Sequence, residues 1–317
     1  MPGKPGKQTF DLFDRPIDWN GTVAFGPLTQ SVVQAGGATV IISIIGKTNI
    51  ETANALHSWV VTGLDAITTL YGHFPVTELQ LLVFPVGRNS DSVPWGEVTR
   101  GGGDAVHLYV DGTRSVDELN ANWVLSHELS HLIHPYISSA DAWLPEGITS
   151  YFKNVLRARS GLIEQPVGWQ KLDAGFKRGR AQFERDRTLA RDAREMMGQG
   201  QYMRVYWIGA AITLISDVEL RRRSGGATSL DTVFEELSRC CLPSERRWTA
   251  SELMTKMDRI AGYDVFMPFY RRYVMEPMFP DLEETYRRLG LSNTLEGLEL
   301  SGEINAASLR ADIMGER

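Results

Sequence analysis

Residues 123–151 read WVLSHELSHLIHPYISSADAWLPEGITSY, and this stretch carries the motif on which the prediction of the fold depends. Within it, His127-Glu128-Leu129-Ser130-His131 is an H-E-x-x-H sequence. Residues four apart lie on one face of a helix, so the imidazoles of His127 and His131 can reach a single metal ion. Glu128 stands beside the first histidine, where its carboxylate can take a proton from an attacking water molecule. The pentapeptide therefore predicts a zinc site with Glu128 as general base.

A helix is expected to present this motif. Ser115-Val-Asp-Glu118 fits a capping box, which places the start of a helix near Val116. Pro135 cannot continue a helix, so the helix should run up to that residue. Apolar residues surround the histidines, as in a helix buried in a catalytic domain: Trp123, Val124, Leu125, Leu129, Leu132 and Ile133. The alternative is a pair of core histidines with ordinary hydrogen bonds.

His134 is a competing ligand by its spacing, because it shares the helical face of the two motif histidines. However, the residue before Pro135 is pushed out of helical geometry. The rise from His127 to His134 is about 10 Å, too far for both to bind one zinc ion. We therefore predict that His134 supports the site or the fold and is not a ligand.

A second helix is predicted after Trp143-Leu144-Pro145-Glu146-Gly147, running from Ile148 to about Arg159. Glu146 falls in its first turn, where a carboxylate is also favoured by the helix dipole. This placement supplies a third ligand and completes a His-His-Glu set with a fourth position left for water. A plain N-terminal helix carboxylate is the alternative for Glu146.

H-E-x-x-H followed by W-x-x-E-G-x-x-x-Y resembles the gluzincin metallopeptidases, which share a thermolysin-like catalytic domain. The glycyl aminopeptidase branch is the most similar, on SHELSHLIHP, on EGITSYFKNVLRARSGLI and on residues 202–237. The 14 residues between His131 and Glu146 also favour that branch. The resemblance implies Zn²⁺ and an α+β fold, in which a small mixed β-sheet precedes a mainly helical lobe and the active-site cleft lies between them.

The resemblance also nominates a tyrosine. In the related families, a Tyr-x-x-Gly sequence at the start of a helix bears the tyrosine that binds the transition state. Here Tyr206-Trp207-Ile208-Gly209 nominates Tyr206, with Tyr202 as second choice. A tyrosine of the core is the alternative.

A glycine-rich segment, Gly101-Gly102-Gly103-Asp104, precedes Val106 to Val110, which we predict as the edge strand beside the cleft. In thermolysin-like domains this strand pairs with the substrate backbone. By resemblance, Gly102 and Gly103 would let the substrate approach, Asp104 would hold its α-amine and His107 would match a histidine of the related family. Because Val106 replaces the family's acidic residue, exopeptidase activity rests on Asp104. A flexible turn is the alternative for the glycines.

The remaining pattern divides the chain into four parts: 1–20 as a flexible leader, 21–114 as a β-rich part with one helix, 115–291 as the zinc-binding lobe and 292–317 as a tail. Strands are predicted at 22–25, 31–34, 38–45 and 79–86, and a helix from the capping box Thr48-x-x-Glu51 to about Tyr71. The charged region 162–197 is predicted to form solvated helices or an excursion over the cleft rim, followed by a long helix at 201–223.

The composition indicates which partners, location and covalent links to expect. The 317 residues are 43% hydrophobic, enough for a sizeable core, and the net charge of −6 argues against a nucleic-acid partner. No apolar run is long enough to span a bilayer. The first residues, MPGKPGKQTF, lack the apolar core of a signal peptide; export is the expectation only if the chain has been trimmed. Cys240 and Cys241 are adjacent, and because neighbours rarely bridge, no disulfide is expected.

Three functions fit these residues. The first is zinc-dependent hydrolysis of a peptide or protein substrate by an aminopeptidase-like enzyme. The second is a degenerate relative that keeps zinc for structure and only binds; the presence of Glu128 and all three ligands argues against it. The third is an enzyme of the same fold that hydrolyses a non-peptide substrate such as an epoxide.

Overall fold

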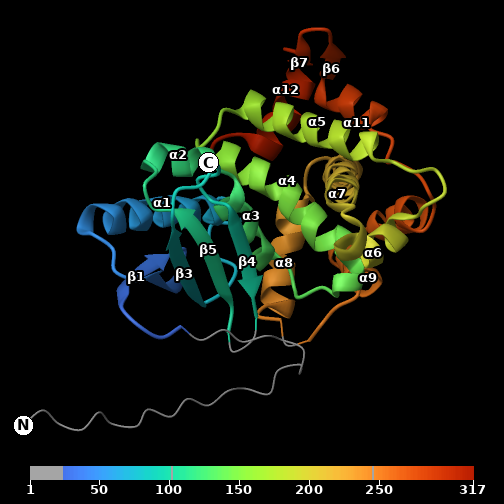
Figure 1. Ribbon diagram of the computed structural model, residues 1–317. Coiled ribbons are helices and arrows are strands. Elements are labelled where there is room, and N and C mark those ends of the chain that lie inside the picture. The colour runs from blue at the N-terminus through green and yellow to red at the C-terminus, as the bar shows by residue number, and fades with distance from the viewer. Residues whose placement is uncertain (1–23, 101–102, 245) are drawn as a thin grey trace, which may run out of the picture.

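A mixed five-stranded sheet and a helical lobe make up the part of the chain that the computed structural model describes, residues 24–100, 103–244 and 246–317 (Figure 1). The strand order is β1-β2-β3-β5-β4. Strands β2, β3 and β5 are parallel, and the outer strands β1 and β4 run antiparallel to their neighbours. The bounds of the strands are Leu28–Ala35 (β1), Ala38–Ile45 (β2), Glu78–Val86 (β3), Trp95–Thr99 (β4) and Ala105–Asp111 (β5). The predicted α+β architecture, a small mixed sheet followed by helices, is confirmed.

The first hairpin and the first helix form largely as predicted. Gly36 and Gly37 take positive φ angles of 53° and 85°, as a two-residue turn between β1 and β2 requires. Helix α1 (Ile50–Thr68) is capped by Asn49, whose side chain accepts from the backbone of Thr52, so the capping box expected at Thr48 was wrong by one residue. Of the strand predicted at 22–25, residues 22 and 23 lie outside the described residues, and 24 and 25 are not in a strand.

The edge of the sheet differs from the prediction. Strand β5 was expected at the edge, but it lies between β3 and β4 and pairs with both. The edge strand is β4, a five-residue segment that the sequence pattern did not reveal. Its register sets Glu97 opposite His107. The strand beside the helical lobe is therefore Trp95–Thr99.

The helix that carries the motif is shorter than predicted. The capping box at Ser115 and Glu118 is present, but it starts the six-residue helix α2 (Val116–Ala121). Asn122 then takes an extended conformation, and its side chain accepts from the backbone of Val124 at 2.8 Å. Helix α3 (Val124–Ser130) follows as a separate element and ends in a 3-10 turn, His131–Ile133. The polar side chain of Asn122 competes with the helix for backbone groups, which explains the break.

Helices form the second half of the described chain. They are α4 (Trp143–Arg159), α5 (Gln165–Ala181), α6 (Leu189–Gln199), α7 (Tyr202–Ser224), α8 (Leu230–Cys241), α9 (Ala250–Ala261), α10 (Phe266–Phe269), α11 (Glu283–Leu289) and α12 (Ile304–Met314). Helix α4 starts at Trp143, five residues before the predicted start at Ile148. The charged region 162–197 is largely helical, as predicted, because it contains α5 and most of α6. Figure 1 shows α4 passing between the sheet and α7.

Helices α4 and α7 cross at a pair of glycines. A Cβ atom at Gly209 would lie 2.1 Å from the backbone oxygen of Trp143 and 2.9 Å from Cα of Gly147. A Cβ atom at Gly147 would lie 2.4 Å from the backbone of Gly209. The two backbones can approach this closely only because neither residue has a side chain. This crossing brings the segment of α7 that contains Tyr206 and Gly209 next to the first turn of α4.

The end of the chain packs onto the helical lobe. Residues 292–317, expected as a tail, include most of the hairpin of β6 (Leu291–Thr294) and β7 (Gly297–Leu300), followed by α12. Ile313 and Met314 of α12 are buried, and Arg159 Nε donates to the carbonyl of Ile313 at 2.8 Å. The predicted domain boundaries stay predictions.

Two expectations from composition have different outcomes. Cys240 and Cys241 form a disulfide, so the expectation that these neighbours do not bridge was wrong. The bond joins adjacent residues and ties no distant parts of the fold together, so it is not a framework that holds the fold. Among the residues that the structure describes, no helix has the length and apolar character needed to cross a membrane.

Candidate metal centre

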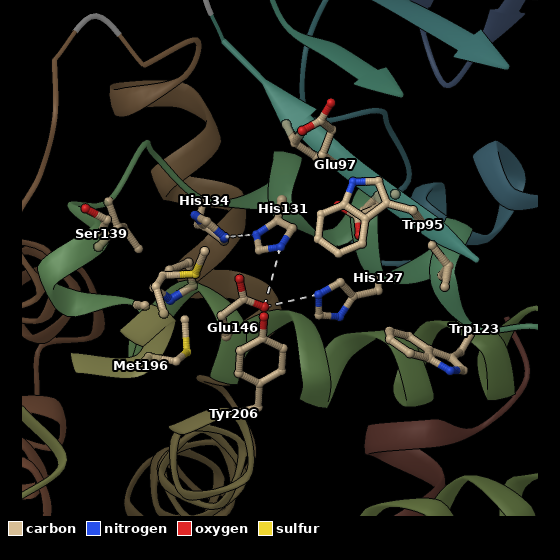
Figure 2. A pocket seen from close by; sticks show the side chains of 18 of the residues that line it. Trp95, Glu97, Trp123, His127, His131, His134, Ser139, Glu146, Met196 and Tyr206 are labelled. Atoms are coloured by element: carbon tan, nitrogen blue, oxygen red, sulfur yellow. Dashed lines mark hydrogen bonds and ion pairs between the residues drawn. The ribbon is translucent and has the colours of Figure 1, made fainter. Parts of the chain in front are cut away.

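Three side chains from two helices converge at the floor of the cleft (Figure 2). His127 lies on α3, His131 at its end, and Glu146 in the first turn of α4. Glu146 Oε2 lies 3.2 Å from His127 Nε2 and 3.8 Å from His131 Nε2. Ligand atoms of a tetrahedral zinc site at about 2.0–2.1 Å from the ion stand roughly 3.3 Å apart. The three predicted ligands therefore fit one zinc ion.

Burial sets the protonation of the two histidines. It lowers the pKa values of His127 and His131 well below 6.5, so both imidazoles are neutral at physiological pH, the form that binds a metal. Burial also raises the pKa of Glu146, against the effects of His131 and of a hydrogen bond from Tyr206. A buried carboxylate beside neutral imidazoles is costly unless a cation neutralises it, which favours a divalent metal at this point.

His131 is supported from behind by His134. His134 Nδ1 donates to the carbonyl of Pro135 at 2.8 Å, which leaves its Nε2 as an acceptor facing Nδ1 of His131 at 3.4 Å. His131 therefore carries its proton on Nδ1 and turns the lone pair of Nε2 toward Glu146. Arg100 holds the same end of the helix, because it donates to the carbonyls of His131 and His134 at 2.7 and 3.2 Å.

Glu128 lies where α3 meets the edge strand. Its side chain lines the same cleft as the three ligands, and a Cβ atom at Gly96 would come within 2.6 Å of Glu128 Cγ. Gly96 therefore allows the backbone of β4 to pass directly beside this carboxylate. Burial, followed by repulsion from Glu146 and Glu97, raises the pKa of Glu128 to about 8. A carboxylate with a raised pKa is a stronger base than one in water.

Tyr206, in the second turn of α7, faces the three predicted ligands. Its ring stacks on His127 with centroids 6.2 Å apart, and its hydroxyl donates to Glu146 (Figure 2). Burial and the nearby carboxylates raise its pKa, so the hydroxyl keeps its proton. Tyr202, the second choice, instead donates to Met197 at 3.6 Å. Of the two tyrosines, Tyr206 is the one whose hydroxyl reaches the ligand set.

The three predicted substrate residues that the structure describes do not line the cleft. Gly102 lies outside the described residues, and Gly103 takes a φ of 132° in the turn after β4. Asp104 accepts from Arg100 Nη1 at 3.2 Å, and His107 is buried on β5. Among the described lining residues of the cleft, none of Gly103, Asp104 and His107 is present.

The carboxylate at the cleft wall is Glu97, which the sequence analysis missed. Glu97 lies on β4 directly after Gly96, and its side chain is 43% exposed. One of its oxygens lies 3.1 Å from Nδ1 of His107. A signal for it was available, because Trp95-Gly-Glu-Val-Thr precedes the glycine turn and can pair with residues 105–109 as a hairpin. The cleft has a volume of about 790 Å³ and extends to both sides of the ligands.

Comparison with solved structures places the chain in a known fold. An aminopeptidase N family protein from Idiomarina loihiensis aligns with a TM-score of 0.60 and 18% identity, over 84% of this chain and 50% of that one. An M1 zinc metallopeptidase from Deinococcus radiodurans aligns with a TM-score of 0.52 and 18% identity, over 81% and 54%. A variant of the Deinococcus radiodurans enzyme, bound to a Tyr-Ser-Ala substrate, aligns at 0.51 and 20%, over 81% and 54%.

These comparisons define the class of fold. The structures that this chain resembles are zinc peptidases of the M1 aminopeptidase group, and the chain spans about half of their length. The expected fold, a mixed sheet followed by a helical lobe, is confirmed, and the described residues include a His-His-Glu group that could hold a metal ion. No family model and no curated protein matches the chain, so the glycyl aminopeptidase branch stays a prediction.

Proposed function

We propose that this chain is a zinc-dependent peptidase that removes residues from the amino terminus of peptides. The observation that supports it most directly is the convergence of His127, His131 and Glu146 at zinc-ligand spacing, with Glu128 beside them. The solved structures of this fold include a metallopeptidase variant bound to a Tyr-Ser-Ala substrate, a peptide of the proposed class.

The chemistry divides between the metal and the chain. A bound zinc ion polarises the scissile carbonyl and lowers the pKa of water. Glu128 accepts the proton of the water as it attacks the carbonyl carbon, and then gives that proton to the nitrogen of the leaving amine. The raised pKa of Glu128 suits both halves of this transfer. Tyr206 keeps its hydroxyl proton and donates a hydrogen bond to the developing oxyanion.

The position of Glu97 supports removal from the amino terminus. Among the described strands β4 is at the edge of the sheet, where it can pair with an extended peptide, and Gly96 brings that edge to Glu128. The partly exposed carboxylate of Glu97 then lies one residue from the reacting centre, where it can bind the α-ammonium group of the first substrate residue. Glu97 takes over the role that the sequence analysis gave to Asp104, whose carboxylate pairs with Arg100.

The two other functions remain as competing outcomes. A binding protein with structural zinc would hold the metal and bind peptides but would not cleave them. A hydrolase for a non-peptide substrate would use Glu128 and the zinc ion but would not need the amine anchor at Glu97. The retained Glu128 and the free β4 edge favour a peptidase over both.

The test combines metal analysis with turnover of a mixed peptide library. We expect one zinc per chain, release of amino-terminal residues, and loss of nearly all activity in Glu128→Gln with the metal retained, because an amide cannot accept the proton. Glu97→Gln is the matched control: it should raise KM for peptides with a free amine and spare the metal. Zinc-loaded protein that cleaves no peptide in the library would contradict the proposal.

A further inference from the structure

Two exposed tryptophans flank the metal ligands on one side of the cleft. Trp95 begins β4 and is 61% exposed, and Trp123 directly precedes α3 and is 45% exposed. Both line the cleft. Figure 2 shows them on the same side of the three ligands, whereas Ser139 and Met196 lie on the other. Exposed indole rings at a cleft wall are typical of a surface that binds an apolar group.

Trp123 is held rigidly from behind. Its ring stands perpendicular to that of His127, with centroids 5.4 Å apart. Lys153 Nζ lies 3.8 Å from the centroid of the Trp123 ring and 5.4 Å from that of Trp207. Lys153 is 8% exposed and His127 is 4% exposed, so both neighbours of the Trp123 ring are buried. Packing against these two buried side chains fixes the Trp123 ring in place.

The direction of the substrate follows from β4, and this step rests on the proposed function. Gly96 lies against Glu128 and so marks the level of the scissile bond. With the α-amine at Glu97, the first substrate residue lies on the Glu97 side of that level. The chain that follows the scissile bond must then continue past Trp95, toward Trp123.

We infer that the site selects peptides with a bulky apolar residue directly after the scissile bond, and that Trp95 and Trp123 bind its side chain. Trp95 supplies contact area from the edge strand, and Trp123 supplies a fixed wall next to His127. A rigid wall loses little conformational freedom when the substrate binds, so the contact adds to affinity. A substrate with a bulky apolar residue at this position is expected to have a kcat/KM roughly tenfold or more higher than the same substrate with alanine.

The test compares Ala-Phe-Gly with Ala-Ala-Gly on the zinc-loaded protein. We expect a preference of about tenfold or more for the phenylalanine peptide in kcat/KM, and a preference of the same direction in Kd on zinc-loaded Glu128→Gln. Trp95→Ala and Trp123→Ala should each reduce both preferences several-fold, while Trp123→Phe keeps part of them. Met197→Ala, on the α6 wall of the cleft, is the matched control and should keep the preferences.

The outcomes separate this inference from the proposed function. Equal values for the two peptides, in turnover and in binding, overturn the inference even if both are cleaved. A preference that survives Trp95→Ala and Trp123→Ala also overturns it, and so does failure to bind either peptide. Binding that favours phenylalanine without any cleavage supports the inference and contradicts the peptidase.

Discussion

Replacement of Gly209 by alanine tests whether the crossing of α4 and α7 assembles the site. Gly209 lies one turn after Tyr206, and its contact Gly147 directly follows Glu146. The new Cβ atom would stand 2.1 Å from the backbone oxygen of Trp143. An ordinary contact of this kind needs about 3.4 Å or more, so the two helices must separate by roughly 1 Å.

The magnitude follows from two opposing terms. Overpacking a tight contact costs about 1–3 kcal/mol, and here the obstruction is backbone, which cannot rotate away. Alanine gains up to about 1 kcal/mol over glycine inside a helix. The net expectation for Gly209→Ala is a loss of about 1–2 kcal/mol in the free energy of unfolding. A shift of about 1 Å between Tyr206 and Glu146 should also lower kcat/KM by roughly a hundredfold.

The assay is urea unfolding of metal-free protein followed by circular dichroism, with zinc affinity and turnover measured on the same samples. Gly198→Ala is the control, because Gly198 is also helical but a Cβ atom there meets nothing within 4 Å. It should be neutral or stabilising by up to about 1 kcal/mol. If Gly209→Ala has the unfolding midpoint, zinc affinity and turnover of the wild type, the crossing does not position the site.

Three further predictions concern single residues. His131→Ala should lose zinc on dialysis against a mild chelator, because it removes one of three protein ligands; elemental analysis that still finds one zinc per chain would contradict the ligand set. His134→Asn should keep stoichiometric zinc but bind it about 10–100-fold more weakly in a chelator competition, because the shorter side chain does not carry an acceptor as far as His134 Nε2, which faces Nδ1 of His131; an unchanged zinc Kd would show that His134 does not support His131 in this way. Burial lowers the pKa of Lys153 from 10.5 in the unfolded chain to about 7 in the folded protein. Between these two pH values, Lys153 is protonated in the unfolded state and neutral in the folded state. The stability of metal-free wild type relative to Lys153→Met should therefore rise from pH 7 to 10, by at most about 1.4 kcal/mol per pH unit, and a flat difference would show that Lys153 does not titrate there.

The grouping of the three candidate ligands could be predicted from the sequence because their geometry is local. Helical periodicity alone places His127 and His131 on one face, and the break at Asn122 leaves that spacing intact within α3 and its last turn. Glu146 could be predicted because a carboxylate in a first turn has a known direction, although α4 begins earlier than expected. His134 was excluded as a ligand by the proline after it, and the structure places it behind His131.

The substrate side of the cleft was decided only by the tertiary structure. Strand order depends on pairing between distant segments, and a five-residue strand such as β4 carries too little pattern to show that it lies outside β5. The positions of two carboxylates follow from that order, since Glu97 reaches the cleft wall while Asp104 turns to Arg100.

The sequence by itself thus determined which histidines meet at the candidate metal centre, because side-chain spacing on a helix follows from a repeat of about 3.6 residues that needs no long-range contact. The tertiary structure decided what stands around that site. Gly209 meets Gly147, Trp123 meets Lys153, and Gly96 meets Glu128 across 30–62 residues of chain, counting from their positions. Such contacts depend on how whole helices and strands pack, and packing is a property of the assembled core that no local pattern encodes.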